Sequence, residues 1–285
     1  MRLRLVLATI LALCPLGAAA QVYQGLWWNP AESGWGLNTT HQGNVIFATL
    51  FTYAADGQPL WLVASNHDRV PMGDGYGMGG EYEEEQFIYS GTLYRTTGPA
   101  FNQVPWTSIG FAPVGDMTIT WVTEASAVLT YSFNGTSVTK LVQRQVFASP
   151  VPSCAPTSGP RAAETNFQDL WWNPAESGWG INLVHQGSLI FATLFTYGEG
   201  GRDKWFVASG LARQPDGSFA GALYATTGPA FNASPWVPIG FGQVGEMRLA
   251  FSDGENGTLT YNVGTATVNK QIQRQVFGAV TSACR

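Results

Sequence analysis

The chain has 285 residues, of which 45% are hydrophobic, 13% aromatic and only 12% charged, and its net charge is −5. A chain of this length can bury the cores of two domains, and its 34 glycines favour many short strands and turns over long helices. It contains no basic run, which excludes an electrostatic surface for nucleic acid.

The first twenty residues have the pattern of a secretory signal peptide. We therefore expect residues 1–20 to lie outside the fold. Arg2 and Arg4 form a basic start, an apolar run follows, and three alanines at 18–20 make a small-residue cleavage site. No later segment approaches the ~20 apolar residues of a membrane-spanning helix. We therefore expect an exported protein, periplasmic or secreted, without a transmembrane segment.

Most of the remaining chain consists of two copies of one unit. The ten residues WWNPAESGWG at 27–36 return unchanged at 171–180, an offset of 144. From LYRTTGPAF at 93–101 and LYATTGPAF at 223–231 onward the offset is 130, so the first copy has 144 − 130 = 14 extra residues. They lie between 66 and 89, in a Gly-rich and acidic stretch that we expect to be a loop.

These offsets define the expected domains. The repeats occupy 22–147 and 166–277, and a Pro/Ser/Ala-rich linker joins them at 148–165. A tail at 278–285 contains Cys284. Within the acidic stretch of the first copy, the EYEEE run at 81–85 is expected to be a solvated loop, with calcium binding as the alternative.

Each copy contains about eight strand-like runs separated by short turn signals such as HQGN and NGTS. In one of them Met117, Ile119 and Trp121 share a face opposite threonines. The runs of the first copy are YQGLWW, WGLNTT, NVIFATLFTY, LWLVAS, FIYSGTLY, MTITWV, AVLTYSF and VTKLVQRQVF. They predict an all-β protein of two tandem eight-stranded antiparallel up-and-down β-barrels, with β-sandwiches as the alternative.

Two cysteines lie at equivalent positions after the two repeats. Cys154 follows Phe147 by seven residues, and Cys284 follows Phe277 by seven. In an oxidising compartment a Cys154–Cys284 disulfide is the natural pairing, and it would enclose the second repeat. An intermolecular bridge or two free thiols are the alternatives.

The repeated motif carries two resemblances. The pattern WWNPAESGWG…HQG…FATLFTY resembles a family of exported bacterial repeat proteins with no assigned activity. More loosely, GLWWNPAES is similar to the opening of avidin-like barrels of the calycin group, and that resemblance implies that Asn29 and Ser33 bind a ligand. Pro30, Glu32 and Trp28 depart from the avidin pattern, so biotin itself is not expected.

Strand counting predicts where a binding site would lie. In an up-and-down barrel the loops at 29–34 and 96–106 open at the same end. Aromatic walls with a few polar groups suit a small amphiphilic ligand or a glycan. The predicted ligand-binding residues are Asn29, Glu32, Ser33, Trp35, Phe101, Asn102 and Trp106, with Asn173, Glu176, Ser177, Trp179, Phe231, Asn232 and Trp236 in the second copy.

Other chemistry has less support. Glu32 and His41 are separated by a strand of roughly 20–30 Å, so a Ser-His-Glu triad is not expected. The histidines and cysteines have no metal-ligand spacing, and no metal or cofactor is predicted. Each proposed site residue also has a structural interpretation. The tryptophans would be core, Asn29 would stabilise the turn, and His41 and His185 would be structural or solvent-facing groups. Glu32 would bind loop amides or an arginine such as Arg144 or, in the second repeat, Arg274.

Three functions remain open. The leading hypothesis is an exported tandem-barrel binding protein for a small amphiphilic ligand or a glycan. The second is a secreted hydrolase that uses Glu32 and Glu176 as general acids or bases, although paired-carboxylate glycoside chemistry needs a second carboxylate. The third is a structural or adhesive surface module without a small ligand. The oligomeric state does not follow from the sequence.

Overall fold

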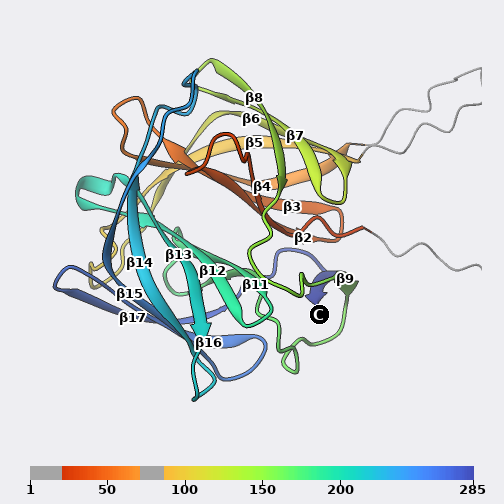
Figure 1. The fold of residues 1–285 in the computed structure, drawn as a ribbon, viewed down its shortest axis with the longest axis vertical. Helices are drawn as coiled ribbons and strands as arrows, with labels where there is room; N and C mark the ends of the chain where they lie inside the picture. Colours follow the sequence, from red (N-terminus) through yellow and green to blue (C-terminus); the bar gives the residue numbers. More distant parts are fainter. Residues whose placement is uncertain (1–20, 71–86) are drawn as a thin grey trace, which may run out of the picture.

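The fold is known from a computed structural model that describes residues 21–70 and 87–285. It consists of two closed antiparallel barrels and a two-stranded ribbon (Figure 1). The predicted signal peptide at 1–20 and the acidic run at 81–85 lie outside the described residues. Within the described ranges, no helix is long and apolar enough to cross a membrane.

Both barrels have up-and-down topology, since each strand pairs with the next and the last pairs with the first. The first barrel contains β1 (Gly25–Trp28), β2 (Gly36–Gln42), β3 (Val45–Tyr53), β4 (Pro59–Val70), β5 (Phe87–Thr97), β6 (Gly110–Thr123), β7 (Ser126–Phe133) and β8 (Thr136–Arg144). The second contains β10 (Asp169–Trp172), β11 (Gly180–Gln186), β12 (Leu189–Tyr197), β13 (Asp203–Arg213), β14 (Phe219–Thr227), β15 (Gly240–Phe251), β16 (Asn256–Val263) and β17 (Ala266–Arg274), with a 3-10 turn η1 (Glu199–Gly201) before β13. The predicted fold class is confirmed.

The barrel interiors are filled by the side chains that strand alternation turns inward. In β7, Ala127, Leu129 and Tyr131 are buried while the residues between them are more exposed. Trp27 and its equivalent Trp171 are completely buried in the two barrels. A closed eight-stranded barrel is just wide enough for side chains to fill it, so these large residues make a packed core.

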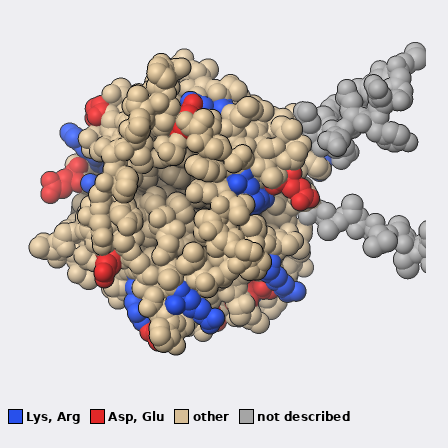
Figure 2. All heavy atoms as spheres, in the orientation of Figure 1, with Lys and Arg blue, Asp and Glu red and all other residues tan. Residues whose placement is uncertain are grey.

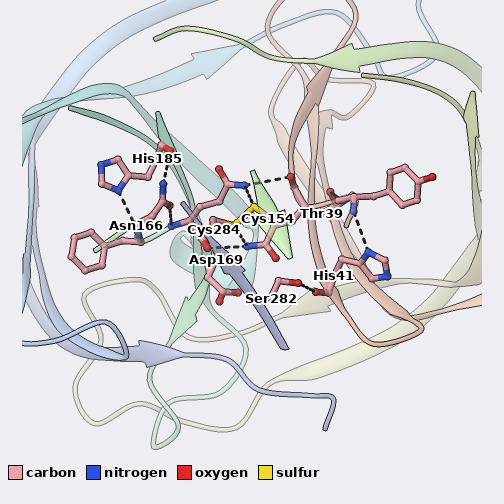
Figure 3. The surroundings of a disulfide bond; sticks show 12 residues. Thr39, His41, Cys154, Asn166, Asp169, His185, Ser282 and Cys284 are labelled. Atoms are coloured by element: carbon pink, nitrogen blue, oxygen red, sulfur yellow. Dashed lines mark hydrogen bonds between the residues drawn. A yellow bond between two sulfur atoms is a disulfide. The ribbon is translucent and has the colours of Figure 1, made fainter. Parts of the chain in front are cut away.

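A disulfide joins the segment between the barrels to the C-terminal tail. β9 (Cys154–Thr157) pairs with β18 (Thr281–Cys284), and Cys154 is bonded to Cys284, as the sequence predicted. The predicted linker at 148–165 is therefore ordered over β9. Around the disulfide, the Nε2 groups of Gln24 and Gln168 each donate to the other residue's carbonyl, at 2.8 and 3.3 Å (Figure 3).

The barrels pack together through pairs of equivalent residues. The indole N–H of Trp61 donates to the carbonyl of Thr196 at 3.0 Å, and that of Trp205 donates to the carbonyl of Thr52 at 3.1 Å. Phe51 and Phe195 lie together in the buried cluster between the barrels. Such reciprocal contacts are those of a two-fold interface, formed here within one chain.

The HQG glutamines also bind across the interface. Gln186 accepts the N–H of Phe147 at 2.9 Å and donates to the carbonyl of Gln145 at 2.9 Å, and Gln42 makes the equivalent contacts with the tail of the second repeat. The run predicted as a strand to Phe147 therefore ends at Arg144 in β8, because the chain leaves the barrel to reach its neighbour.

The loops after β5 and β14 are exchanged between the barrels. Phe231 packs on Tyr131 and Phe133 of the first barrel, and Phe101 packs on Phe206 and Tyr261 of the second. In Figure 1 the blue segment after β14 reaches the first barrel near β8, and the yellow segment after β5 lies beside β15 and β17. We name this end of each barrel the exchange end. The opposite end, where the turns after β2 and β6 lie in the first barrel and those after β11, β13 and β15 in the second, is the histidine end.

Loop exchange predicts that truncating a loop destabilises the barrel that receives it. Phe231→Ala removes a buried ring from the first barrel and should lower its free energy of unfolding by about 3–5 kcal/mol. In hydrogen exchange, amides of β7 and β8 should lose protection before those of β16 and β17. Phe101→Ala is the matched control and should show the reverse order. Loss of protection in the barrel that carries the substitution would contradict the exchange.

Candidate functional site

The predicted site residues at the start of the motif form a turn. The Asn29 side-chain oxygen accepts the N–H of Ala31 at 2.9 Å, and the Glu32 N–H donates to the Asn29 carbonyl at 3.0 Å. Asn173 makes the same contacts in the second repeat. Asparagine commonly stabilises turns by bonding its own backbone two residues on. The oxygen that the avidin resemblance assigns to a ligand is therefore occupied by the turn.

Glu32 is held by a cation and an indole. Its carboxylate lies 2.7 Å from Lys140 Nζ and accepts the Trp35 indole N–H at 3.1 Å. Lys140 in turn lies over the ring of Trp236, 5.6 Å from its centroid. The contacts of Glu176 with Lys270 and Trp179, and of Lys270 with Trp106, repeat this arrangement.

The end of the motif receives the exchanged loop. The Trp236 indole N–H donates to the Ser33 carbonyl at 3.0 Å. Gly34 has φ of +107°, and a Cβ there would lie 2.4 Å from Ile239 of the other barrel. Both its conformation and this approach require glycine. The segment is preserved because it is the receptor for a loop that is itself repeated.

The structure thus corrects the predicted grouping of site residues. Phe101 and Trp106 do not lie over the motif of their own repeat. They contact the second barrel, where the Trp106 indole N–H donates to the Ser177 carbonyl at 3.0 Å. Phe231 and Trp236 take their place over the first barrel. Asn102 and Asn232 are exposed. Strand counting placed the loops at the correct end but could not identify which barrel they cover.

The opposite end of the first barrel contains a buried, fully bonded histidine. His41 Nδ1 accepts the N–H of Tyr23 at 3.1 Å, and its Nε2 lies 3.1 Å from the Tyr89 hydroxyl. Because Nδ1 accepts, the neutral ring carries its proton on Nε2 and donates it to that hydroxyl. Burial lowers the pKa of His41 to about 4. The structural interpretation of this residue is confirmed.

In the second barrel the equivalent end has a cavity. His185 Nδ1 accepts the N–H of Phe167 at 3.2 Å, but its Nε2 has no hydrogen-bond partner among the described residues (Figure 3). The side chain is 6% exposed and lines a cavity of about 760 Å³. The wall consists of Pro150, Pro152, Thr165, Asn166, Phe167, His185, Gly187, Ser188, Arg213, Asp216, Gly217, Ser218, Phe219, Ala250, Phe251 and Arg285.

Substitutions between the repeats account for the difference. Tyr89, which binds His41, is replaced by Phe219. Strand register confirms the equivalence, since Arg69 pairs with Tyr89 in the first barrel and Arg213 with Phe219 in the second. The other equivalent pairs that lose a hydroxyl, an indole or a ring are Tyr23/Phe167, Trp121/Phe251 and Phe87/Gly217.

At the histidine end both barrels contain a stacked pair of aromatic rings, but the side chains of the second barrel are smaller. Tyr23 stacks on Trp121 with ring centroids 4.3 Å apart, and Phe167 stacks on Phe251 at 3.7 Å. The rings of Phe167 and Phe251 thus form an apolar floor, and Phe219 stands edge-on to His185 at 5.1 Å. Sequence reasoning missed this site. The sequence predictions used positions that both repeats share, whereas the signal for this site was the divergence of the repeats at this end.

A second cavity of about 200 Å³ lies between the barrels. Trp61, Trp172 and Trp179 line it, and the Trp172 indole N–H has no hydrogen-bond partner in the described part of the chain. It is smaller than the ~300–1,000 Å³ usual for small-molecule sites. The cavity at the histidine end of the second barrel is therefore the candidate site.

Charged groups are sparse on the surface, and Figure 2 shows them scattered without a patch of one sign on the face in view. No cluster of three or more His, Cys, Asp or Glu side chains that could hold a metal ion occurs in the described part of the chain. No protein-family model matches the chain, and neither the search of curated proteins nor that of solved structures finds a similar protein.

The ion pair at the exchange end predicts a stability effect. Glu32→Gln leaves the Lys140 ammonium, with a side chain only 12% exposed, without its anionic partner. The free energy of unfolding should fall by about 1–3 kcal/mol in urea denaturation, less than for a fully buried pair because the site is partly solvated. The double variant Glu32→Gln/Lys140→Met should recover most of the loss. Full stability of Glu32→Gln alone would assign the carboxylate another role.

The buried titratable groups predict loss of stability in acid. Burial lowers the pKa of His41, His67 and His185 to about 4, so the stability they contribute is present above the unfolded value of about 6.5 and is lost as pH falls toward 4. Asp203 opposes this, because burial raises its pKa to about 6 and its contribution favours the fold at low pH.

At about pH 5 unfolding should therefore take up roughly two protons, and the free energy of unfolding should fall by about 2–3 kcal/mol per pH unit. Denaturant titrations between pH 7 and 5 measure this slope. His67→Gln should reduce it by about one proton. A flat profile in the parent chain would show that the histidines titrate normally in the fold.

Proposed function

We propose that this protein is an exported binding protein for a small amphiphilic molecule, which it holds in the cavity at the histidine end of the second barrel. The observation that carries the proposal is the difference between the repeats. Among the described residues, the first barrel buries Tyr23, Tyr89 and Trp121 at this end, whereas the second has phenylalanines at these positions and a cavity of about 760 Å³. The volume falls in the usual range for small-molecule sites.

The lining suits a ligand with an apolar body and a polar group. Phe167, Phe219 and Phe251 provide the apolar surface, and His185 supplies one buried donor. A mostly apolar pocket with a few oriented polar groups is the usual form of a small-molecule site. The Cys154–Cys284 disulfide supports export, because disulfides persist in oxidising compartments.

The alternatives have less support. Both carboxylates of the hydrolase hypothesis are ion-paired, Glu32 with Lys140 and Glu176 with Lys270, and they lie at the exchange end, away from the cavity. A purely structural or adhesive module would account for the exchanged loops. It would not account for a cavity lined by phenylalanine rings and by the buried residue His185.

The test uses a neutral aromatic dye, N-phenyl-1-naphthylamine, whose fluorescence rises in apolar surroundings. The parent chain should bind it, and Phe251→Trp, which restores the residue type of the first barrel, should weaken binding at least about tenfold, or ~1.4 kcal/mol. Phe241→Trp is the matched control, because Phe241 is 73% exposed and lies outside the cavity. Absence of dye binding, or equal binding by Phe251→Trp, would contradict the proposal.

A further inference from the structure

The charges around this cavity do not balance. Arg213 of the second repeat occupies the position of Arg69 in the first. In the first barrel the Arg69 guanidinium lies over the ring of Phe87, 4.4 Å from its centroid. Gly217 replaces that ring in the second barrel, so Arg213 has lost its aromatic partner. It makes no ion pair with any described residue.

The other charged groups near the cavity are already paired. Asp216 accepts from Ser218 at 2.7 Å and is ion-paired with Arg248. Arg285 lies 3.2 Å from Glu164. Behind the wall, Arg274 and Arg161 are both bound to the buried carboxylate of Asp169, at 3.0 and 2.5 Å. The unpaired charge at the cavity is therefore the positive charge of Arg213.

His185 adds a donor of fixed direction. Its Nδ1 is occupied by the N–H of Phe167, so the neutral ring presents an N–H at Nε2. Burial is the main cause that lowers its pKa to about 4, and the positive charges of Arg213 and Arg274 lower it further. At neutral pH Arg213 thus offers a cation and His185 an N–H donor, and the His185 ring has no acceptor free.

We propose that the ligand of this cavity is an amphiphilic organic anion, with an oxyanion group bound by Arg213 and His185 and an apolar body on the phenylalanine floor. The assignment rests on the proposed function, since it names the ligand class of the same cavity. A guanidinium binds oxyanions through paired N–H donors, and such charge-assisted bonds are stronger than neutral ones. A neutral ligand would make no use of the Arg213 charge.

The experiment compares two dyes that differ by one sulfonate. The anion 8-anilino-1-naphthalenesulfonate and the neutral N-phenyl-1-naphthylamine share the same rings. We expect the parent chain to bind the anion at least about fivefold more tightly at low salt, with the preference shrinking as salt screens the exposed Arg213. Arg213→Gln should abolish the preference and leave binding of the neutral dye within about twofold.

Two variants control for other causes. Arg202→Gln makes the same change in net charge at an exposed position in the turn between β12 and β13, at the opposite end of the barrel, and should keep the preference. Phe219→Tyr restores the hydroxyl that binds the histidine in the first barrel. It should weaken binding of the anion more than binding of the neutral dye, because the hydroxyl would occupy the His185 N–H.

The outcomes separate the two proposals. Equal affinities for the two dyes in the parent chain, or equal weakening of both by Arg213→Gln, would overturn the inference that the ligand is an anion. The binding site itself would still be supported if Phe251→Trp abolished dye binding. Failure of the chain to bind either dye would overturn both. If anion binding survived Arg213→Gln but not Phe251→Trp, a group other than Arg213 would bind the sulfonate, and the inference would also be overturned.

Discussion

Each barrel is completed by a loop that belongs to the other barrel. Phe231 is buried and Phe101 is partly buried against the neighbouring core, and each loop's tryptophan donates to the neighbouring motif. Removing either loop would expose two apolar surfaces at once, so the barrels are stabilised as a pair. Gly34 of the motif allows the close approach of Ile239 from the other barrel, and Lys140, which binds Glu32, lies over the ring of the exchanged Trp236.

The two ends of each barrel differ in how similar the two repeats are. At the exchange end both repeats must satisfy the same contact, so the motif and the loop that it receives stay nearly identical. At the histidine end Gln42 and Gln186 make such equivalent contacts, but the aromatic positions inside the barrel differ between the repeats. There the second barrel has replaced Tyr89 by Phe219 and Trp121 by Phe251, and a packed core has become a cavity.

The ribbon between the barrels connects the fold to the cavity. Pro150, Pro152 and Arg285 line the cavity and flank the disulfide of Cys154 with Cys284. Arg285 and Ser153 also exchange backbone hydrogen bonds at 2.8 and 2.9 Å. A wall made of linker and tail would otherwise be mobile, since chain ends are rarely ordered unless tied down. The disulfide therefore holds the shape of the candidate site as well as the chain.

The sequence by itself determined the eight strands of each repeat, the two barrels and the Cys154–Cys284 pairing, because side-chain alternation and repeat offsets are local or periodic signals. Only the tertiary structure decided which barrel each TTGPAF loop covers, because two near-identical loops fit either motif equally well as sequence. It also decided that Glu32 binds Lys140 and that the cavity lies beside His185. Those outcomes depend on side chains from distant strands meeting at one end of a closed barrel, where the loss of one hydroxyl or one ring changes a filled core into a binding site.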